Sequence, residues 1–151
     1  MIFRGTFEHA LDAKNRLTVP SKYRDVLRKA GVVIAFSPET EVGTTRSLSI
    51  WCPDDYDSFV QRALAELNPL GPRARDLRNL LYGNSWDLEI DSANRLVIPQ
   101  PARDFAGLEK EVVITGAGDH LQLWDRKAFA DYNAVALSRF SEITASFDHT
   151  H

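Results

Sequence analysis

A short polar motif occurs twice in this chain, and its residue types suit either a locked turn or contact with a nucleic acid. The first copy runs from Asp12 to Arg16 and the second from Asp91 to Arg95, an offset of 79 residues (91 minus 12). The residues that recur at this offset are Asp12, Asn15, Arg16, Leu17, Pro20, Arg24 and Asp25, matched by Asp91, Asn94, Arg95, Leu96, Pro99, Arg103 and Asp104. A spacing shared over so many positions is typical of an internal repeat.

The Asp-x-x-Asn-Arg pattern has two interpretations. In the structural one, the Asp carboxylate accepts hydrogen bonds from turn amides and pairs with the Arg four residues on. In the functional one, Lys14, Asn15 and Arg16 project from an exposed turn onto DNA. Lysine would meet a phosphate there, and arginine or asparagine would reach base edges in the major groove. The two interpretations are compatible if the Asp orients an Arg that also contacts DNA.

Charge is distributed unevenly along the chain. Residues 1–30 hold seven Lys or Arg against three Asp or Glu, and residues 31–151 hold 11 against 18, so the first segment is +4 and the rest −7. A local basic surface on an acidic body can bind a polyanion while the rest limits non-specific association. A solvated surface with chance asymmetry would look the same. On the charge argument Arg4, Lys22 and Arg24 join the candidate DNA-binding residues.

Residues that could serve catalysis or metal binding do not form a recognisable constellation. Cys52 lies directly before a predicted helix with Asp54 and Asp55 in its first turn, which disfavours a thiolate. At the 73-residue offset that relates Trp51 to Trp124, its counterpart is Asp125, so a helix cap or core position is predicted. None of the histidines (His9, His120, His149 and His151) has the spacing of a metal ligand. The sequence therefore predicts no catalytic site, metal, cofactor or small-molecule substrate.

The composition is that of an ordinary soluble globular protein. Of the 151 residues, 44% are hydrophobic and 26% charged. The longest strongly apolar run, near residues 32–36, is far shorter than the roughly 20 residues that span a bilayer. The N-terminus has no basic-then-apolar signal region, and a single cysteine suits a reducing compartment. We expect a cytoplasmic protein with no membrane partner.

Hydrophobic periodicity predicts the same order of elements in both copies: strand, strand, helix, strand, strand, helix. The turn at residues 12–15 is expected to join two strands into a hairpin. Each copy is too small to bury much surface by itself, so the hairpins of one are expected to complete the sheet of the other as a pseudo-symmetric barrel. The predicted boundaries are 3–53 for the first repeat, 54–81 for a helical linker region, 82–125 for the second repeat, and 126–151 for a C-terminal helix and tail.

Several segments of the chain together carry a specific resemblance to a known protein family. The residues that carry it are Phe3-Arg4-Gly5, Leu11-Asp12-Ala13-Lys14-Asn15-Arg16-Leu17, Val19-Pro20, Tyr23-Arg24, Asp91 to Arg95, and Pro99. Over about residues 1–140 the chain resembles the MraZ family. One departure is Asn15 and Asn94, which stand where glycine is expected before the arginine, and asparagine is tolerated in such a turn.

The resemblance implies an α+β protein, with a double-split β-barrel built from two SpoVT-AbrB-like swapped-hairpin repeats and packed helices. It implies a ring-shaped homo-oligomer that binds double-stranded DNA at repeated sites in its own promoter. Such a protein would be cytoplasmic and nucleoid-associated. It would regulate, typically repress, the bacterial division and cell-wall gene cluster. The alternative is a ring-forming scaffold in which the motif is purely structural.

Carried onto this chain, the family motif is Asp12 and Arg16 with Asp91 and Arg95, and Arg16 is the residue most needed for DNA binding. The first copy is expected to lead on DNA, because Arg95 is the only basic residue of the second turn. The sequence leaves open the number of subunits, the operator, the sign of regulation and the role of the longer first-copy loop from Glu39 to Thr45.

Overall fold

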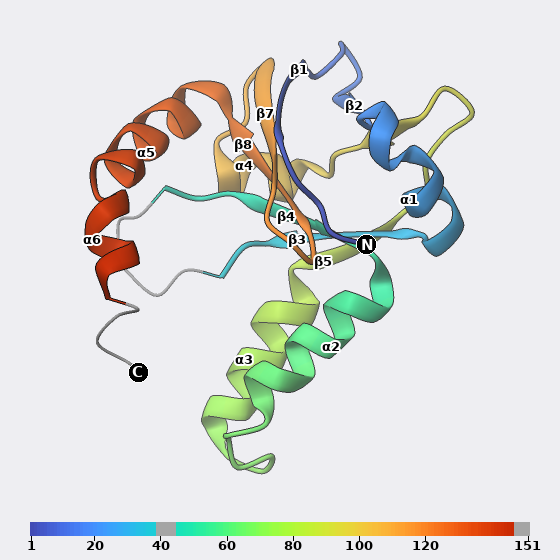
Figure 1. The fold of residues 1–151 in the computed structure, drawn as a ribbon. Coiled ribbons are helices and arrows are strands. Elements are labelled where there is room, and N and C mark those ends of the chain that lie inside the picture. The colour runs from blue at the N-terminus through green and yellow to red at the C-terminus, as the bar shows by residue number, and fades with distance from the viewer. Residues whose placement is uncertain (39–44, 147–151) are drawn as a thin grey trace.

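The structure, a computed structural model, describes residues 1–38 and 45–146 and has a mixed α+β architecture. Among these residues, eight strands form two antiparallel sheets (Figure 1). The larger sheet has six strands in the order β1(Thr6–Ala10), β7(Glu111–Gly116), β8(Leu121–Asp125), β4(Leu48–Trp51), β3(Val32–Phe36), β5(Ser85–Leu88). The smaller sheet, called the ribbon below, pairs β2(Arg16–Thr18) with β6(Arg95–Val97). The pairings of the described residues form an open sheet and a ribbon, not a closed barrel.

Strands from the start of each copy pair with strands of the other copy. In the larger sheet β1 lies beside β7 and β5 beside β3, while in the ribbon Leu17 of β2 lies opposite Leu96 of β6. The later strands pair within their own copy, β3 with β4 and β7 with β8, and β4 also pairs with β8 of the other copy. The two copies are therefore interleaved, and neither contains all the partners of its own strands.

The predicted hairpin at the first motif was wrong. β1 and β2 are joined by the turn at residues 12–15, but β1 pairs with β7 and β2 with β6. The turn is closed by the Asp12 amide donating to the Arg16 carbonyl at 3.1 Å. Beyond that bond the strands part into different sheets. Alternation of polar and apolar residues indicates an extended segment and which face is buried, but it does not identify the partner strand.

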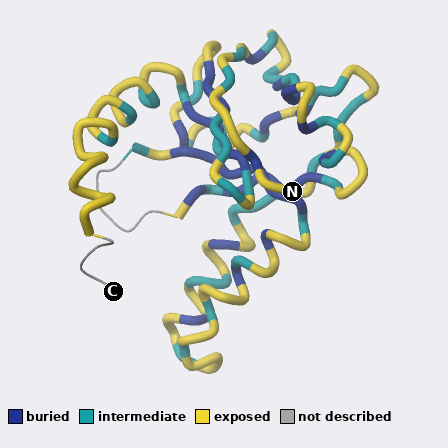
Figure 2. Tube along the Cα trace, in the orientation of Figure 1, coloured by how far each residue is buried: buried dark blue, intermediate teal, exposed yellow. Residues whose placement is uncertain are grey.

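The main core is built from both copies. Its fully buried side chains include Leu17, Tyr23, Ile34, Leu96 and Ile114, each with 1% or less of its surface exposed. Burying one such aliphatic side chain is worth about 1.5–3 kcal/mol, and side chains of both copies contribute to this one core. Burial is concentrated on the strands, whereas the helices at the edges are mostly exposed (Figure 2).

Short helices follow the ribbon strands in both copies. η1(Ser21–Tyr23) and α1(Arg24–Ala30) follow β2, and α4(Gln100–Ala106) follows β6. α2(Pro53–Leu64) and α3(Pro72–Gly83) form a helical hairpin that projects from the body (Figure 1). The predicted apolar stripe of α2 is confirmed at Tyr56 and Val60, which are buried in a second, smaller core.

The chain closes with α5(Arg126–Ser138) and α6(Phe140–Ala145). The predicted cap of α5 is confirmed, because the Asp125 side chain accepts a hydrogen bond from the Ala128 amide at 3.3 Å. α6 lies in a stretch for which no regular period was predicted. Residues 39–44 of the longer first-copy loop and residues 147–151 of the tail fall outside the described residues. Within the described part of the chain, no helix combines the length and apolar character needed to cross a bilayer.

Candidate nucleic-acid interface

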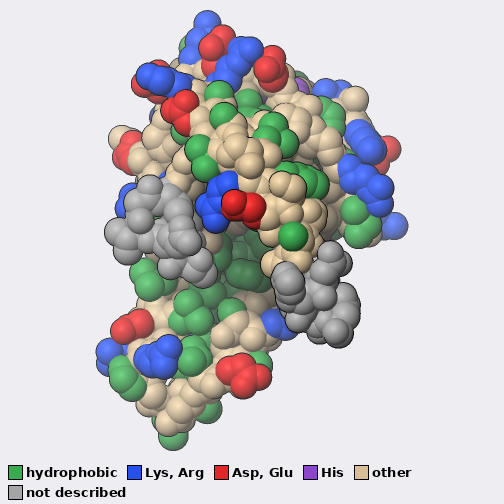
Figure 3. All heavy atoms as spheres, turned by 60° about the vertical axis from the view of Figure 1, so that its left-hand side comes forward, with side chains coloured by type: hydrophobic (Ala, Val, Ile, Leu, Met, Phe, Trp, Pro, Cys, Tyr) green, Lys and Arg blue, Asp and Glu red, His purple; other side chains and the backbone are tan. Residues whose placement is uncertain are grey.

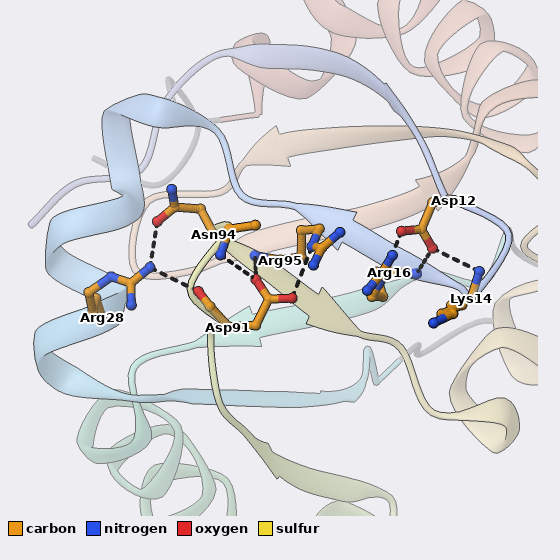
Figure 4. Close-up of polar contacts among 8 residues, drawn as sticks. Asp12, Lys14, Arg16, Arg28, Asp91, Asn94 and Arg95 are labelled. Carbon is orange, nitrogen blue, oxygen red and sulfur yellow. Dashed lines mark hydrogen bonds and ion pairs between the residues drawn. The ribbon is translucent and has the colours of Figure 1, made fainter.

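Each motif turn is locked by its aspartate. Asp12 Oδ1 accepts from the amides of Lys14 and Arg16, both at 2.9 Å, and Oδ2 accepts from Arg16 Nε at 2.6 Å. Asp91 makes the same three contacts at 2.9 Å each, with the amides two and four residues on and with Arg95 Nε. The structural interpretation of the motif thus describes both turns, and the two ion pairs lie at opposite ends of the ribbon (Figure 4).

The asparagines of the motif hold the tightest point of each turn. Asn15 and Asn94 have φ of 60° and 63°, in the left-handed region that asparagine tolerates better than most residues. Their carbonyl groups tie the copies together: Asn15 accepts from the Ile98 amide at 3.0 Å, and Asn94 from the Val19 amide at 2.9 Å. This geometry explains why asparagine can stand here in place of glycine.

Both motif carboxyl groups have lowered pKa values. For Asp12 the largest cause is the hydrogen bond from the Arg16 amide, supported by the Arg16 guanidinium. For Asp91 partial burial acts in the opposite direction, but the hydrogen bonds from Arg95 outweigh it and the pKa is still lowered. Both groups are therefore charged at neutral pH. A carboxylate in this state suits the orientation of an arginine better than proton transfer.

The outer face of the ribbon presents the two motif arginines together. Arg16 lies opposite Val97, and Thr18 lies opposite Arg95. Residues opposite one another share a face, and the leucine between them in each strand is buried on the other face. The Arg16 and Arg95 side chains are 24% and 31% exposed. Within the described residues only their Nε atoms are hydrogen-bonded, so their terminal nitrogens remain available as donors.

Two other predicted cations, Arg4 and Lys22, meet at Tyr23. The backbone amide and carbonyl of Arg4 both bind the Tyr23 hydroxyl, at 2.7 and 2.8 Å. Lys22 Nζ lies 5.5 Å from the centre of the Tyr23 ring. Both cations are exposed. Tyr23 thus fixes the backbone of Arg4 and contacts the side chain of Lys22, whereas Lys14 lies at the first turn.

Arg24 has a structural contact of its own. Its Nε donates to the Val19 carbonyl at 2.9 Å, and in the second copy Arg103 Nε donates to the Ile98 carbonyl at 3.1 Å. The repeated contact ties each helix to the strand before it. Arg24 was predicted to bind DNA on the basis of its charge alone, and this structural contact was not foreseen. Because the contact uses Nε, the terminal nitrogens of the Arg24 side chain remain for a ligand.

Sequence reasoning missed one residue of this site, Arg28 of α1. Its Nη2 donates to the Asp91 carbonyl at 3.1 Å and to Asn94 Oδ1 at 2.5 Å, so a helix of the first copy holds the turn of the second (Figure 4). Arg28 had entered only as one of the basic residues of the first segment. The two partners are 66 residues apart, and no spacing in the sequence links them.

Both copies of the motif lie in segments that match one known protein family. A family model described as "MraZ protein, putative antitoxin-like" matches residues 2–79 and 81–149, one segment for each copy. The chain belongs to the MraZ family. The resemblance carried by the repeated motif is thereby confirmed over nearly the whole length.

Relatives with the printed name "Transcriptional regulator MraZ" cover most of the chain. The one from Mycoplasmoides gallisepticum is 34% identical over 150 residues, 99% of this chain and 100% of the relative. The one from Nitrosomonas europaea is 39% identical over 127 residues, 82% and 81% of the two chains. The one from Thiobacillus denitrificans is 36% identical over 147 residues, 96% and 95%. This MraZ chain is thus similar in length and sequence to whole members of the family.

Proposed function

We propose that this MraZ chain is a transcriptional regulator that binds DNA through the outer face of the ribbon and its two turns. The observation that carries the proposal is the pair of partly exposed arginines, Arg16 and Arg95, each oriented through Nε by an aspartate while its terminal nitrogens remain available. The printed names of the relatives point to the same class of protein.

A two-stranded ribbon fits the major groove of B-DNA, where an arginine can donate two hydrogen bonds to a guanine. Held by its aspartate, each arginine loses little side-chain freedom on binding. Lys14 is exposed at the end of the first turn and would meet a phosphate. At the second turn the corresponding residue is Ala93. The first turn therefore supplies more positive charge, and we assign it the leading role.

The remaining candidates serve affinity rather than sequence recognition. Arg4 and Lys22, beside Tyr23, would contact phosphates, as would the terminal nitrogens of Arg24. We assign Asn15 to base contacts. Within the described residues, the side-chain hydrogen bonds of the first turn are accepted by Asp12, and the side-chain oxygen of Asn15 accepts none. The Asn94 oxygen accepts from Arg28.

Exposed apolar surface on the C-terminal helices supports the part of the proposal that concerns self-association. Large hydrophobic side chains on α5 and α6 are 43–62% exposed: Tyr132, Val135, Leu137, Phe140 and Ile143. Figure 3 brings that side of the molecule forward and shows further hydrophobic side chains gathered where the α2–α3 hairpin meets the body. Exposed apolar surface of this kind favours subunit contacts.

We extend the proposal to a ring of double-split barrels that binds repeated sites in its own promoter and represses the division and cell-wall gene cluster. Several subunits on one DNA would multiply weak contacts.

The test is DNA binding by the full chain across a range of salt concentrations. Wild type, Arg16→Ala and Arg95→Ala are titrated with the upstream DNA of the gene and with shuffled DNA by fluorescence anisotropy. Arg75→Ala is the matched control, because Arg75 is an exposed arginine of α3 whose ion pair, among the described residues, is with the neighbouring Asp76. For wild type, log affinity should fall linearly with log salt. Loss of one bidentate base contact costs about 1–3 kcal/mol, roughly 5- to 150-fold.

Arg16→Ala should lose the preference for upstream DNA while keeping the fold and the oligomeric mass. Arg95→Ala should lose less. Equal binding of upstream and shuffled DNA by wild type would leave the scaffold alternative, which the turn-locking role of the Asp–Arg pairs favours. Wild-type binding by Arg16→Ala would remove the assignment of the first turn.

A further inference from the structure

The two motif turns differ in one contact. At the second turn, Arg28 Nη2 lies between the Asp91 carbonyl oxygen at 3.1 Å and Asn94 Oδ1 at 2.5 Å. At the first turn the corresponding acceptors are the Asp12 carbonyl oxygen and Asn15 Oδ1. Within the described residues, neither of these two oxygens accepts a hydrogen bond from a side chain.

The difference comes from the lengths of the helices that follow the ribbon strands. α1 continues to Ala30, and its last turn carries Arg28. α4 ends at Ala106, and residues 107–110 follow as a loop before β7. At the motif offset of 79, the residue that corresponds to Arg28 is Gly107 (28 plus 79). Gly107 has no side chain, so this chain supplies no guanidinium to its first turn from that position.

The acceptors of the first turn are nonetheless preformed. The Asn15 amide donates to the Asp12 carbonyl at 2.9 Å, and the Asn94 amide donates to the Asp91 carbonyl at 3.0 Å. The asparagine φ angles of 60° and 63° agree as well. A carbonyl oxygen has two lone pairs, and the Asp91 oxygen uses its second for Arg28. The Asp12 oxygen has the same capacity in the same turn.

The two residues that carry these acceptors, Asp12 and Asn15, line a pocket. Its volume is about 640 Å³, within the usual range of about 300–1,000 Å³ for ligand sites. One wall is the first turn and the other is the loop after α4; the lining residues are Leu11, Asp12, Ala13, Asn15, Leu108, Glu109 and Lys110. Glu109 adds an exposed carboxylate that favours a cation, and Lys110 supplies an ammonium that competes with one.

We propose that this pocket binds a guanidinium group, in the manner in which the second turn binds Arg28. The group would come from a free guanidinium compound or from an arginine side chain of a second copy of this chain, which has 13 arginines. The site rests on the internal symmetry of the turns. It shares Asn15 with the proposed DNA-binding surface, so its test contains no DNA and a failure to bind DNA would leave its outcome unchanged.

The first experiment measures binding of free guanidinium to the pocket. The ¹⁵N-labelled protein is titrated with guanidinium chloride to about 50 mM, far below unfolding concentrations, and with ammonium chloride as a control of equal ionic strength. We expect saturable shifts of the amide signals of Ala13, Asn15 and residues 108–110 with guanidinium and not with ammonium. Arg28→Ala is the positive control. It removes the guanidinium that fills the second turn, so guanidinium chloride should then cause a second saturable response at Asp91–Asn94.

Two variants test the acceptor itself. Asn15→Gly keeps the left-handed turn and removes Oδ1, and it should abolish the response of the first turn. Asn15→Asp replaces the amide with a carboxylate of the same shape, and it should tighten guanidinium binding several-fold. Lys110→Ala should also tighten it, since the competing ammonium is removed.

The second experiment detects an arginine from a second copy. If such an arginine already fills the pocket, free guanidinium should leave the wild-type signals unchanged. Asn15→Gly should then lower the oligomeric mass in sedimentation velocity, while Asn15→Asp should preserve or raise it. A wild-type response that persists in Asn15→Gly overturns the proposal. So does the absence of both the wild-type response and the change in mass, or a response confined to Arg28→Ala.

Discussion

The Tyr23 hydroxyl binds both backbone polar groups of Arg4, accepting from its amide at 2.7 Å and donating to its carbonyl at 2.8 Å. The Tyr23 ring is fully buried and packs 4.8 Å from the ring of Phe3. A core residue of the first copy thus fixes the N-terminal segment that leads into β1. This segment carries one of the cations that we assign to DNA.

Replacing Tyr23 by Phe should destabilise the protein by about 1–3 kcal/mol, because two backbone groups lose their partner while the ring keeps its packing. Urea unfolding of the full chain measures the change. Hydrogen exchange of the Arg4 amide should become faster than that of strand amides in β7. An unchanged midpoint and unchanged exchange would mean that water replaces the hydroxyl without cost.

Gly116 should not tolerate a side chain. A Cβ built there would lie 2.5 Å from the Phe3 carbonyl carbon and closer still to the backbone of Arg4. The N-terminal segment that contains these two residues would therefore have to move. Gly116→Ala should cost about 1–3 kcal/mol, as overpacking does. Gly83→Ala is the matched control, because a Cβ at Gly83 meets nothing within 4 Å and alanine favours the helix. Equal unfolding midpoints for the two variants would contradict the close approach.

The motif aspartates should make stability depend on pH below neutrality. The folded pKa of Asp12 lies below its usual value of 3.8, chiefly because of the Arg16 amide. Stabilisation from such a group is fully present above the unfolded pKa and is lost as the pH falls through the folded value. The stability gap between wild type and Asp12→Asn, from urea unfolding, should therefore narrow as the pH falls below about 4. Asp91→Asn should behave in the same way, and a gap that widens on acidification would contradict the ion-paired turn.

Cys52 should be a slow nucleophile. Burial raises the pKa of its thiol, and the carboxylate of Asp55 raises it further. Because the thiolate is the reactive form, alkylation by iodoacetamide at pH 8 should be much slower in the folded protein than after unfolding in urea. A rate equal to that of the unfolded chain would show that the thiol is exposed and ionised. The sequence predicted this low reactivity from the acidic helix start alone.

Local features of the fold could be predicted from the sequence because their causes are local. The offset of 79 located both turns, and the Asp12 contacts that lock the first turn all lie within four residues. The Asp125 cap and the apolar stripe of α2 likewise depend on neighbours along one helix. In each case a few adjacent side chains decide the structure.

Partners distant in sequence could not be predicted in the same way. The alternation around Phe7 indicates a strand but not that Ile114 lies opposite, which is why a hairpin was expected at the first turn. Arg28 and Asn94 are joined only because a helix of one copy packs beside a turn of the other. The count of charges included Arg28 but did not reveal that its side chain is already bound.

The interleaving of the two copies has a consequence for synthesis on the ribosome. β1 cannot pair until β7 has been synthesised, roughly 100 residues later. At a synthesis rate of about 5–20 residues per second, the delay is about 5–20 s. β2 and β6 are separated in the same way. During this interval the nascent first copy holds apolar strands without their partners. Folding is therefore expected to follow the completion of the chain, with the late strands closing structures that the early ones cannot form.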